Sequence, residues 1–242
     1  MNIDALQDRV RESRNIVFFG GAGVSTESGI PDFRSPDGLY HMHYAYPPET
    51  IISHSFFLAH PEEFYRFYRE KMLCLDAAPN ITHKKLAELE TAGKLKAIVT
   101  QNIDGLHQKA GSRAVYELHG SVHRNYCMEC GAFYDGAFIK ESRGIPRCSC
   151  GGMIKPDVVL YEECLDDVVV RGAIAAIGQA DLLIVGGTSL NVYPAAGMLQ
   201  YFQGKTLVLI NKSPTPFDAK ADLLYQTSLG SVFGVLKTGE EI

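Results

Sequence analysis

The most informative part of the sequence is Gly20-Gly21-Ala22-Gly23-Val24-Ser25-Thr26-Glu27-Ser28-Gly29-Ile30-Pro31-Asp32-Phe33-Arg34-Ser35. It follows an apolar, β-prone run at residues 15–19, so the pattern predicts a buried parallel strand, a glycine turn and the start of a helix. Glycines let the backbone approach a ligand closely, and N–H groups at the start of a helix favour an anion such as a diphosphate. The usual dinucleotide fingerprint has a third glycine where this chain has Thr26, so the spacing alone leaves a purely structural turn open.

The residues after these glycines carry groups that suit a nucleotide. Ser25 and Ser28 supply hydroxyl groups, and residues 29–31, Gly-Ile-Pro, bend the chain back. Arg34 is suited to neutralise phosphate, and Phe33 to cover a flat ring or to shield a reactive carbon. The alternative is a capped turn with an ion pair on the surface.

Length and composition indicate one large α/β domain with a small satellite. The chain has 242 residues, of which 46% are hydrophobic, and a formal net charge of −5. It has no block of like charges, so direct nucleic-acid binding is not expected. The uncharged stretch 182–204 contains Asn191 and Pro194 and is too polar to span a membrane, and the start of the chain lacks a signal peptide. We therefore expect a cytoplasmic protein with no membrane contact.

Hydrophobic periodicity and turn residues give the order of the elements. They predict helices at 3–14, 61–75, 81–92 and 194–202, and strands at 15–19, 97–100, 114–118, 182–185 and 206–210. Helices between most strands favour an α/β fold with a doubly wound parallel sheet. Polar motifs follow the strands at 101–107, 119–121, 186–189 and Asn211, and open α/β sheets bind ligands at these strand ends. Residues 36–60, rich in proline and aromatics, form either a segment that closes over a ligand or a packed loop.

Four of the six cysteines form a compact pattern. Cys127-x2-Cys130-x17-Cys148-x-Cys150 has the content of a four-thiolate zinc site, although its second pair has one intervening residue instead of two. A closed shell of four cysteines leaves no open position for a substrate, so one structural zinc is expected rather than a catalytic one. The alternative is four reduced, buried thiols. Cys74 and Cys164 lie outside the pattern and are expected to be ordinary buried residues.

Several motifs together resemble the sirtuins of the bacterial type, a family of NAD-dependent protein-lysine deacylases. The likeness runs from about residue 14 to 235 and includes Gly21 to Ser35, Gln101-Asn102-Ile103-Asp104, Glu117-Leu118-His119-Gly120-Ser121 and the cysteine pattern. It implies a large Rossmann-like NAD-binding domain, which we expect at 1–34, 76–120 and 158–242. The small domain, a helical insert with the zinc module, is expected at 35–75 and 121–157.

The resemblance also implies a role for each site residue. His119 is the expected base, Asn102 organises the ribose and its water, and Asp104 holds the nicotinamide carboxamide together with the Ile103 backbone. The residues expected to contact NAD are Ala22, Thr26, Phe33, Arg34, Gln101, Ile103, Asp104, His119, Thr188, Ser189, Asn211 and, near the adenine, Leu229.

In the mechanism that this resemblance implies, the acyl carbonyl oxygen of a modified lysine attacks the ribose carbon that bore nicotinamide. His119 then deprotonates a ribose hydroxyl group, and water completes the reaction. NAD is consumed as a co-substrate, and the products are free lysine, nicotinamide and O-acyl-ADP-ribose, which is O-acetyl-ADP-ribose for an acetyl group.

The partner implied by the resemblance is an acetyl-lysine protein or peptide bound between the two domains. It is expected to pair as an extended strand with Val158, Val159 and Leu160 on one side and Leu190, Asn191 and Val192 on the other. The family usually has Phe-Gly-Glu where this chain has Tyr161-Glu162-Glu163, and we expect the loss of that glycine to alter the loop. A monomer is expected.

One position bears on the choice of acyl group. Sirtuins that prefer succinyl or malonyl groups carry Tyr-x-x-Arg on the helix near the acyl slot. This chain has Tyr65-Arg66-Phe67-Tyr68, with Tyr68 in place of the arginine, while Arg66 and Arg69 fall on other faces of the helix. Acetyl, or another neutral acyl group, is therefore the expected substrate.

Two other functions use the same residues. One is ADP-ribosyl transfer to a protein, in which another nucleophile attacks at the same NAD site. The other is a non-catalytic sensor of NAD or acyl-lysine, against which the presence of His119, Asn102 and Asp104 argues.

Overall fold

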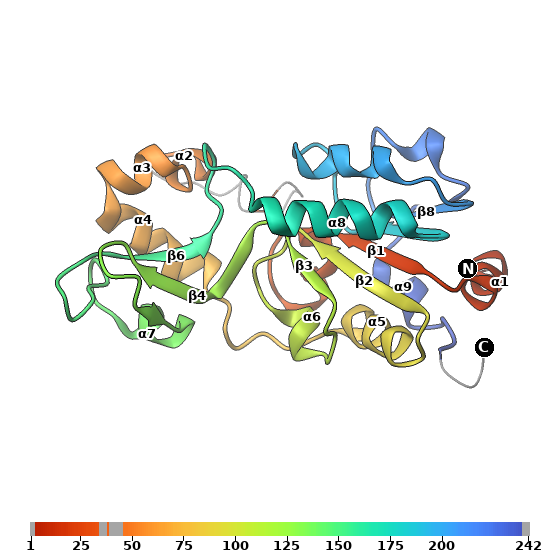
Figure 1. The fold of residues 1–242 in the computed structure, drawn as a ribbon, viewed down its shortest axis with the longest axis horizontal. Helices are drawn as coiled ribbons and strands as arrows, with labels where there is room; N and C mark the ends of the chain where they lie inside the picture. The colour runs from red at the N-terminus through yellow and green to blue at the C-terminus, as the bar shows by residue number, and fades with distance from the viewer. Residues whose placement is uncertain (1–2, 34–37, 39–45, 239–242) are drawn as a thin grey trace.

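A six-stranded parallel sheet forms the larger part of the computed structural model, which describes residues 3–33, 38 and 46–238 (Figure 1). Its strand order is β3-β2-β1-β7-β8-β9, and every neighbouring pair is parallel. The strands are β1 (Ile16–Gly20), β2 (Leu95–Thr100), β3 (Val115–Glu117), β7 (Leu182–Gly186), β8 (Thr206–Ile210) and β9 (Leu223–Tyr225). This is the doubly wound order, in which the winding reverses between β1 and β7.

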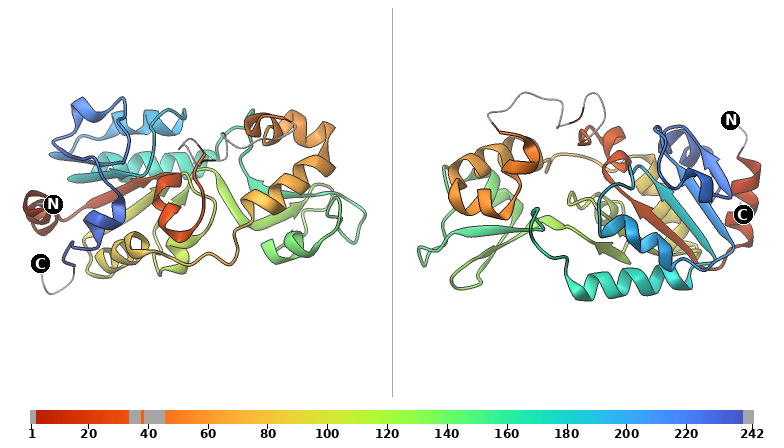
Figure 2. Two further views of the ribbon diagram at one scale, coloured as in Figure 1. Left: turned by 180° about the vertical axis from the view of Figure 1, so that it is seen from behind. Right: turned by 90° about the horizontal axis from the view of Figure 1, so that it is seen from above.

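Helices cover both faces of this sheet because successive strand residues point to opposite sides. Phe18 of β1 packs in the core beneath α1 (Asp4–Glu12), α5 (Ile81–Thr91) and α9 (Leu229–Phe233). Val17 and Phe19 pack in a second core, beneath α8 (Asp167–Gln179) and η5 (Ala195–Tyr201). Figure 2 shows α8 running along one side of the sheet, with α1 and α5 on the other.

A smaller unit lies at the end of the molecule away from both termini (Figure 1). It holds a three-stranded antiparallel sheet in the order β5-β4-β6, and the chain enters it twice. A third apolar core joins this sheet to the helical insert. The elements of this unit are α2 (Pro48–Ile51), α3 (His54–Ala59), α4 (Pro61–Phe67), η4 (Tyr68–Met72), β4 (Gly120–Cys127), β5 (Phe133–Tyr134), α7 (Gly136–Glu141) and β6 (Ile154–Val158).

The parallel sheet with a small cysteine-bearing unit confirms the predicted fold class, and several local predictions differ. After the glycine loop the chain forms two short 3-10 turns, η1 (Ala22–Val24) and η2 (Thr26–Ser28), instead of starting an α-helix. The helix predicted at 61–75 is α-helical to Phe67 and continues as a π turn, and the segment predicted at 194–202 is a 3-10 helix. The remaining elements, α6 (Leu106–Lys109) and η6 (Asp218–Lys220), are single turns. The residue boundaries expected for the two domains stay a prediction.

Across residues 3–33, 38 and 46–238, none of the helices combines the length and the apolar character that a membrane span requires.

Two buried histidines lie between α5 and α6. The rings of His83 and His107 are 4.8 Å apart, and His83 Nδ1 accepts the N–H of Asn80, which caps α5. His107 is 1% exposed, and within the described chain neither of its ring nitrogens has a hydrogen-bond partner. Burial lowers the pKa of His107 to about 3, helped by the charge of His83, and burial lowers the pKa of His83 to about 4 against the pull of Asp104. Both rings are therefore neutral in the folded protein near pH 7.

These histidines predict acid sensitivity of the fold. Their pKa values are lower in the folded state than the value of about 6.5 in the unfolded chain, so stability is full above pH 6.5 and falls as the pH drops towards about 4. Each histidine changes the free energy of unfolding by up to about 1.4 kcal/mol per pH unit in this window. Urea unfolding between pH 7.5 and pH 4.5 measures the slope. His107→Gln is expected to reduce this slope, and an equal slope in the substituted and unsubstituted proteins would contradict the assignment.

Candidate active site at the switch point of the large sheet

Two glycine loops meet where the winding of the sheet reverses, at the carboxyl ends of β1 and β7. The N–H of Gly23 donates to Gly187 O at 2.8 Å, and the N–H of Gly21 donates to Gly186 O at 3.4 Å. A Cβ atom on Gly23 would lie 2.8 Å from Gly187 Cα, so a side chain there would separate the loops. The glycines are thus required by contact between the two loops, besides leaving room for a ligand.

Ser25 joins the first loop to the motif that follows β2. Its hydroxyl group donates to Asp104 Oδ2 at 2.6 Å and accepts from Asn102 Nδ2 at 3.0 Å. It is buried, as is Asn102, and Thr26 closes the turn by donating its hydroxyl to Gly23 O at 3.1 Å. The sequence singled out Ser25 only as a source of a hydroxyl group, whereas the structure makes it the hydrogen-bond link between the predicted residues Asn102 and Asp104.

The segment after β2 is fixed at several points, which holds the Asp104 carboxylate in place. Asp104 Oδ1 accepts the N–H of Leu106 at 2.9 Å, and the carbonyl of Asp104 lies 3.0 Å from His123 Nε2. The N–H of Val122 donates to Ile103 O at 3.0 Å, so β4 supports this segment from the small sheet. His123 could not be predicted from the sequence, because a single histidine on a strand belongs to no recognisable motif.

His119 follows β3 and is held in one orientation. Its Nδ1 lies 2.9 Å from the carbonyl oxygen of Gln101, and the Gln101 side chain donates to Thr188 Oγ1 at 3.1 Å. A carbonyl oxygen only accepts, so Nδ1 carries the hydrogen and Nε2 carries the lone pair in the neutral ring. Burial lowers the pKa of His119 below its usual range, against a smaller opposing effect of the bond to Gln101. The imidazole is therefore neutral near pH 7 and can accept a proton at Nε2.

The other predicted cofactor residues within the described part of the chain lie around the two glycine loops or beside the small unit. Ala22, Thr188 and Ser189 belong to the two loops, and Asn211 follows β8, where its side chain donates to Ser213 O at 2.7 Å. Leu229 is buried behind the loop, against the positions of Gly186 and Gly187. Phe33 packs with Ile103 against the core of the small unit. Arg34 lies outside the described residues, and its role stays a prediction.

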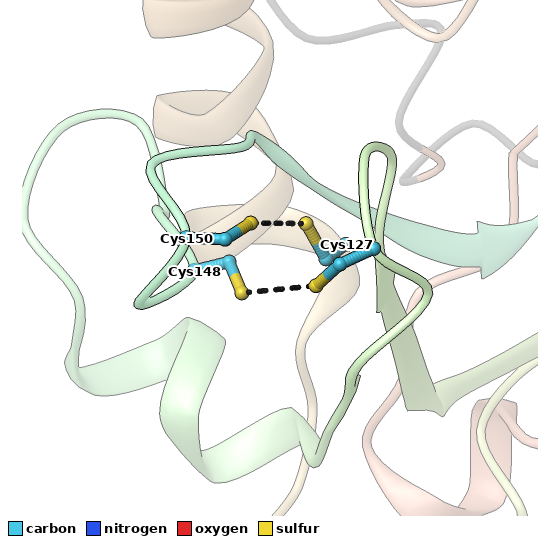
Figure 3. A group of neighbouring side chains, drawn as sticks. Cys127, Cys148 and Cys150 are labelled. Atoms are coloured by element: carbon cyan, nitrogen blue, oxygen red, sulfur yellow. Dashed lines mark hydrogen bonds between the residues drawn. The ribbon is translucent and has the colours of Figure 1, made fainter.

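The four predicted zinc cysteines come together at one end of the small sheet (Figure 3). Their sulfur atoms all lie within 4.8 Å of one another, with 3.5 Å between Cys127 and Cys150 and 3.5 Å between Cys130 and Cys148. Tetrahedral zinc with bonds of about 2.3 Å needs sulfur atoms about 3.8 Å apart, so the cluster fits this metal.

Two backbone N–H groups favour the thiolate form of Cys127 and of Cys148. The N–H of Cys130 lowers the pKa of Cys127, and the N–H of Cys150 lowers the pKa of Cys148 to about 6. The close Cys-x-Cys pair reaches one centre because the chain turns sharply at Gly151, which has φ +90° and donates its N–H to Cys148 O. Cys74 is half-buried, but Cys164 is exposed, so the expectation of burial was wrong for Cys164.

Residues 158–160 run between the two units beside His119. The N–H of Val159 donates to the carbonyl of His119 at 3.0 Å, and Val158 pairs with Gly120. Gly120 has φ +73°, and a Cβ atom there would lie 1.9 Å from the carbonyl oxygen of Asp157. The predicted peptide segment is therefore anchored directly on the residue predicted to be the base.

The chain is similar to known proteins over almost its whole length. The Sir2 family description matches residues 21–194. An NAD-dependent protein deacetylase from Clostridium perfringens is 62% identical over 236 residues, which are 96% of this chain and 97% of that protein.

Solved structures agree with these sequence matches. A structure described as "Sir2-p53 peptide-NAD+" has a TM-score of 0.86 at 42% identity, covering 97% of this chain and 96% of its own. Another, of Sir2 with an inhibitor, 2′-O-acetyl-ADP-ribose and a deacetylated p53 peptide, has a TM-score of 0.85 at 39% identity and covers 96% of each chain. In both comparisons the likeness spans the large sheet and the small unit together.

Proposed function

This chain belongs to the Sir2 family, and on that premise we propose that it is an NAD-dependent protein deacetylase that removes acetyl groups from lysine side chains. The reaction consumes NAD and gives nicotinamide and O-acetyl-ADP-ribose. The hydrogen-bonded series Thr188, Gln101, His119 carries this proposal, because it presents a neutral imidazole nitrogen at the ligand-binding end of the sheet.

Each part of the site has a role in this reaction. The glycines of the two loops leave room for the diphosphate beside the backbone, while Asp104, fixed by Ser25, holds the carboxamide of nicotinamide. Asn102, which donates to the Ser25 hydroxyl group at 3.0 Å, organises the ribose and its water. His119 Nε2 accepts the proton of a ribose hydroxyl group, and the Gln101 carbonyl stabilises the imidazolium that forms, through Nδ1.

Zinc has a structural role here. The thiolates of Cys127, Cys130, Cys148 and Cys150 would occupy all four positions of a zinc ion, so the metal would stabilise the fold of the small unit and would offer no open position to a substrate.

The acetylated peptide binds in extended form between the two units. Support comes from the neighbours described with peptides and from the anchoring of Val159 on His119. The peptide pairs with Val158, Val159 and Leu160 on one side and with Leu190, Asn191 and Val192 on the other. All these residues come from one chain, which fits a monomer.

The preference for one acyl group over another tests whether Tyr68 takes the place of an acyl-binding arginine. Tyr68 is fully buried and stacks on Phe64, while Arg66 pairs with Glu63 and Arg69 donates to the carbonyl of Ile139 at 3.0 Å. A succinyl carboxylate would meet no arginine at position 68, which costs at least about 1.4 kcal/mol, or tenfold in rate. With NAD and a panel of acyl-lysine peptides, we expect acetyl turnover to exceed succinyl turnover by at least about tenfold. Faster removal of succinyl would contradict this assignment of the slot.

The same assay separates deacetylation from ADP-ribosyl transfer. Mass spectrometry of the peptide shows loss of the acetyl group in the first case and gain of ADP-ribose in the second. We expect loss of acetyl, and an ADP-ribosylated peptide with its acetyl group retained would contradict the proposed function.

A further inference from the structure

The loop after β6 carries a residue in a backbone conformation that favours glycine. Glu162 has φ +76°, where an amino acid with a side chain costs free energy that glycine does not. Leu190, in the other predicted peptide segment, is the only other non-glycine residue with positive φ in the described chain. A strained residue persists when its surroundings hold it, so the contacts of Glu162 require an explanation.

The side chain of Glu162 binds the first turn of α3. Its Oε2 accepts the N–H of Ser55 at 2.8 Å, and its Oε1 accepts the hydroxyl group of Ser55 at 3.0 Å. The backbone follows the same path: the N–H of Tyr161 donates to Ile52 O, and the N–H of His54 donates to Tyr161 O, both at 3.0 Å. Figure 1 shows this loop rising from β6 to α2 and α3 before it turns into α8. A carboxylate is well placed here because the first N–H groups of a helix have no partner within the helix.

The next residue fixes the peptide segment itself. Glu163 Oε1 lies 2.8 Å from His54 Nδ1, and its Oε2 accepts the N–H of Leu160 at 2.9 Å and the Lys155 ammonium at 3.1 Å. Leu160 is the last residue of the segment that is expected to pair with the peptide. Two successive carboxylates therefore tie the end of this segment to α3, and Glu162 is the one whose backbone is strained.

We propose that Glu162 is a positioning residue for the peptide, which holds residues 158–160 extended by binding the start of α3 through Ser55. The inference rests on the proposed function and deepens it. The two bonds from Ser55 offset the strain at φ +76°, so the carboxylate takes over the role that a glycine backbone would otherwise have in shaping this loop. Loss of the carboxylate releases the loop, and the peptide must then order it on binding.

Steady-state kinetics of substituted proteins test the proposal. Glu162→Ala keeps the strain and loses both bonds, so it should raise the KM for acetylated peptide by about 3- to 10-fold, with kcat and the KM for NAD within about twofold of the unsubstituted protein. Glu162→Gly loses the bonds but relieves the strain, so its KM should fall between those of Glu162→Ala and the unsubstituted protein. Glu162→Gln, which keeps an acceptor oxygen, should change the KM least. The proposal would be overturned if Glu162→Gly and Glu162→Ala both had a peptide KM equal to or lower than that of the unsubstituted protein.

Two controls separate this mechanism from others. Asp167→Asn removes the same charge five positions further on, in the first turn of α8, and should leave the peptide KM unchanged; an equal rise there would mean that simple charge attraction is responsible. Ser55→Ala should raise the KM in the unsubstituted protein and have no effect in Glu162→Ala, and additive effects would overturn the link through Ser55. Hydrogen exchange should show faster exchange at Ser55 and Tyr161 in Glu162→Ala, without peptide present.

The proposed function and this inference fail in different ways. If the unsubstituted protein does not deacetylate the peptide, the proposed function fails. If it does so and Glu162→Ala has the same peptide KM and the same exchange rates, only the positioning role fails.

Discussion

His119→Ala should lower kcat for deacetylation by about 10²- to 10⁴-fold, the range lost when a positioned general base is removed. Nε2 of His119 is the nitrogen with the lone pair in the neutral ring, because Nδ1 donates to Gln101 O. The fold should survive, since His119 is only half-buried and Gln101 keeps its bond to Thr188. Steady-state assays measure the loss, and thermal unfolding with and without NAD should show that the variant still folds and binds the nucleotide.

A matched control is His60→Ala, in which an exposed histidine of the small unit is removed. It should retain normal activity. Normal turnover by His119→Ala would contradict the assignment of the base, and loss of folding would show that its role is structural.

Loss of zinc should unfold the small unit. Structural zinc in short peptides contributes about 10–16 kcal/mol, as much as the whole stability of a typical domain, about 5–15 kcal/mol. Cys148→Ser removes one of the four ligands, and a chelator removes the metal. Deacetylation should be lost with either treatment, because β4 begins directly after His119 and the N–H of Val159 binds the His119 carbonyl.

Zinc content by atomic absorption, together with circular dichroism and limited proteolysis, measures this effect. Cys164→Ser, at an exposed thiol outside the cluster, is the matched control and should keep zinc, fold and activity. A Cys148→Ser protein with full metal content and unchanged proteolysis would contradict the four-thiolate site.

The large sheet could be predicted because its strands are continuous apolar runs followed by polar motifs. The strands β1, β7 and β8 are buried along their whole length, and β2 is buried except at Lys96, so their apolar pattern is strong. The order of helices and strands then favours a parallel sheet. Helix α8 lacked such a signal. Val168, Val169 and Val170 favour strands, and Gly172 weakens a helix, yet a Cβ atom at Gly172 would lie 2.4 Å from the Tyr116 ring. Close packing of α8 on β3 therefore requires a glycine at this position, although glycine has a low intrinsic preference for helices.

The residues of the site could be predicted from motifs, but the hydrogen bonds that join them could not. The resemblance supplied His119, Asn102 and Asp104, but the links through Ser25 and His123 depend on contacts between segments about 80 and 20 residues apart. Spacing in sequence carries no information on such contacts. Glu162 is similar: the sequence shows that a glycine is missing, and only the fold shows that Ser55 lies opposite its carboxylate.

The most direct test of the whole account is the balance between NAD and the acetyl group. Purified protein is incubated with NAD, with and without an acetylated peptide, and nicotinamide, deacetylated peptide and O-acetyl-ADP-ribose are quantified together. We expect nicotinamide release to require the acetylated peptide and all three products to form in equimolar amounts. Deacetylation without nicotinamide release, or nicotinamide release with the acetyl group still on the peptide, would contradict the proposed coupling of NAD cleavage to deacetylation.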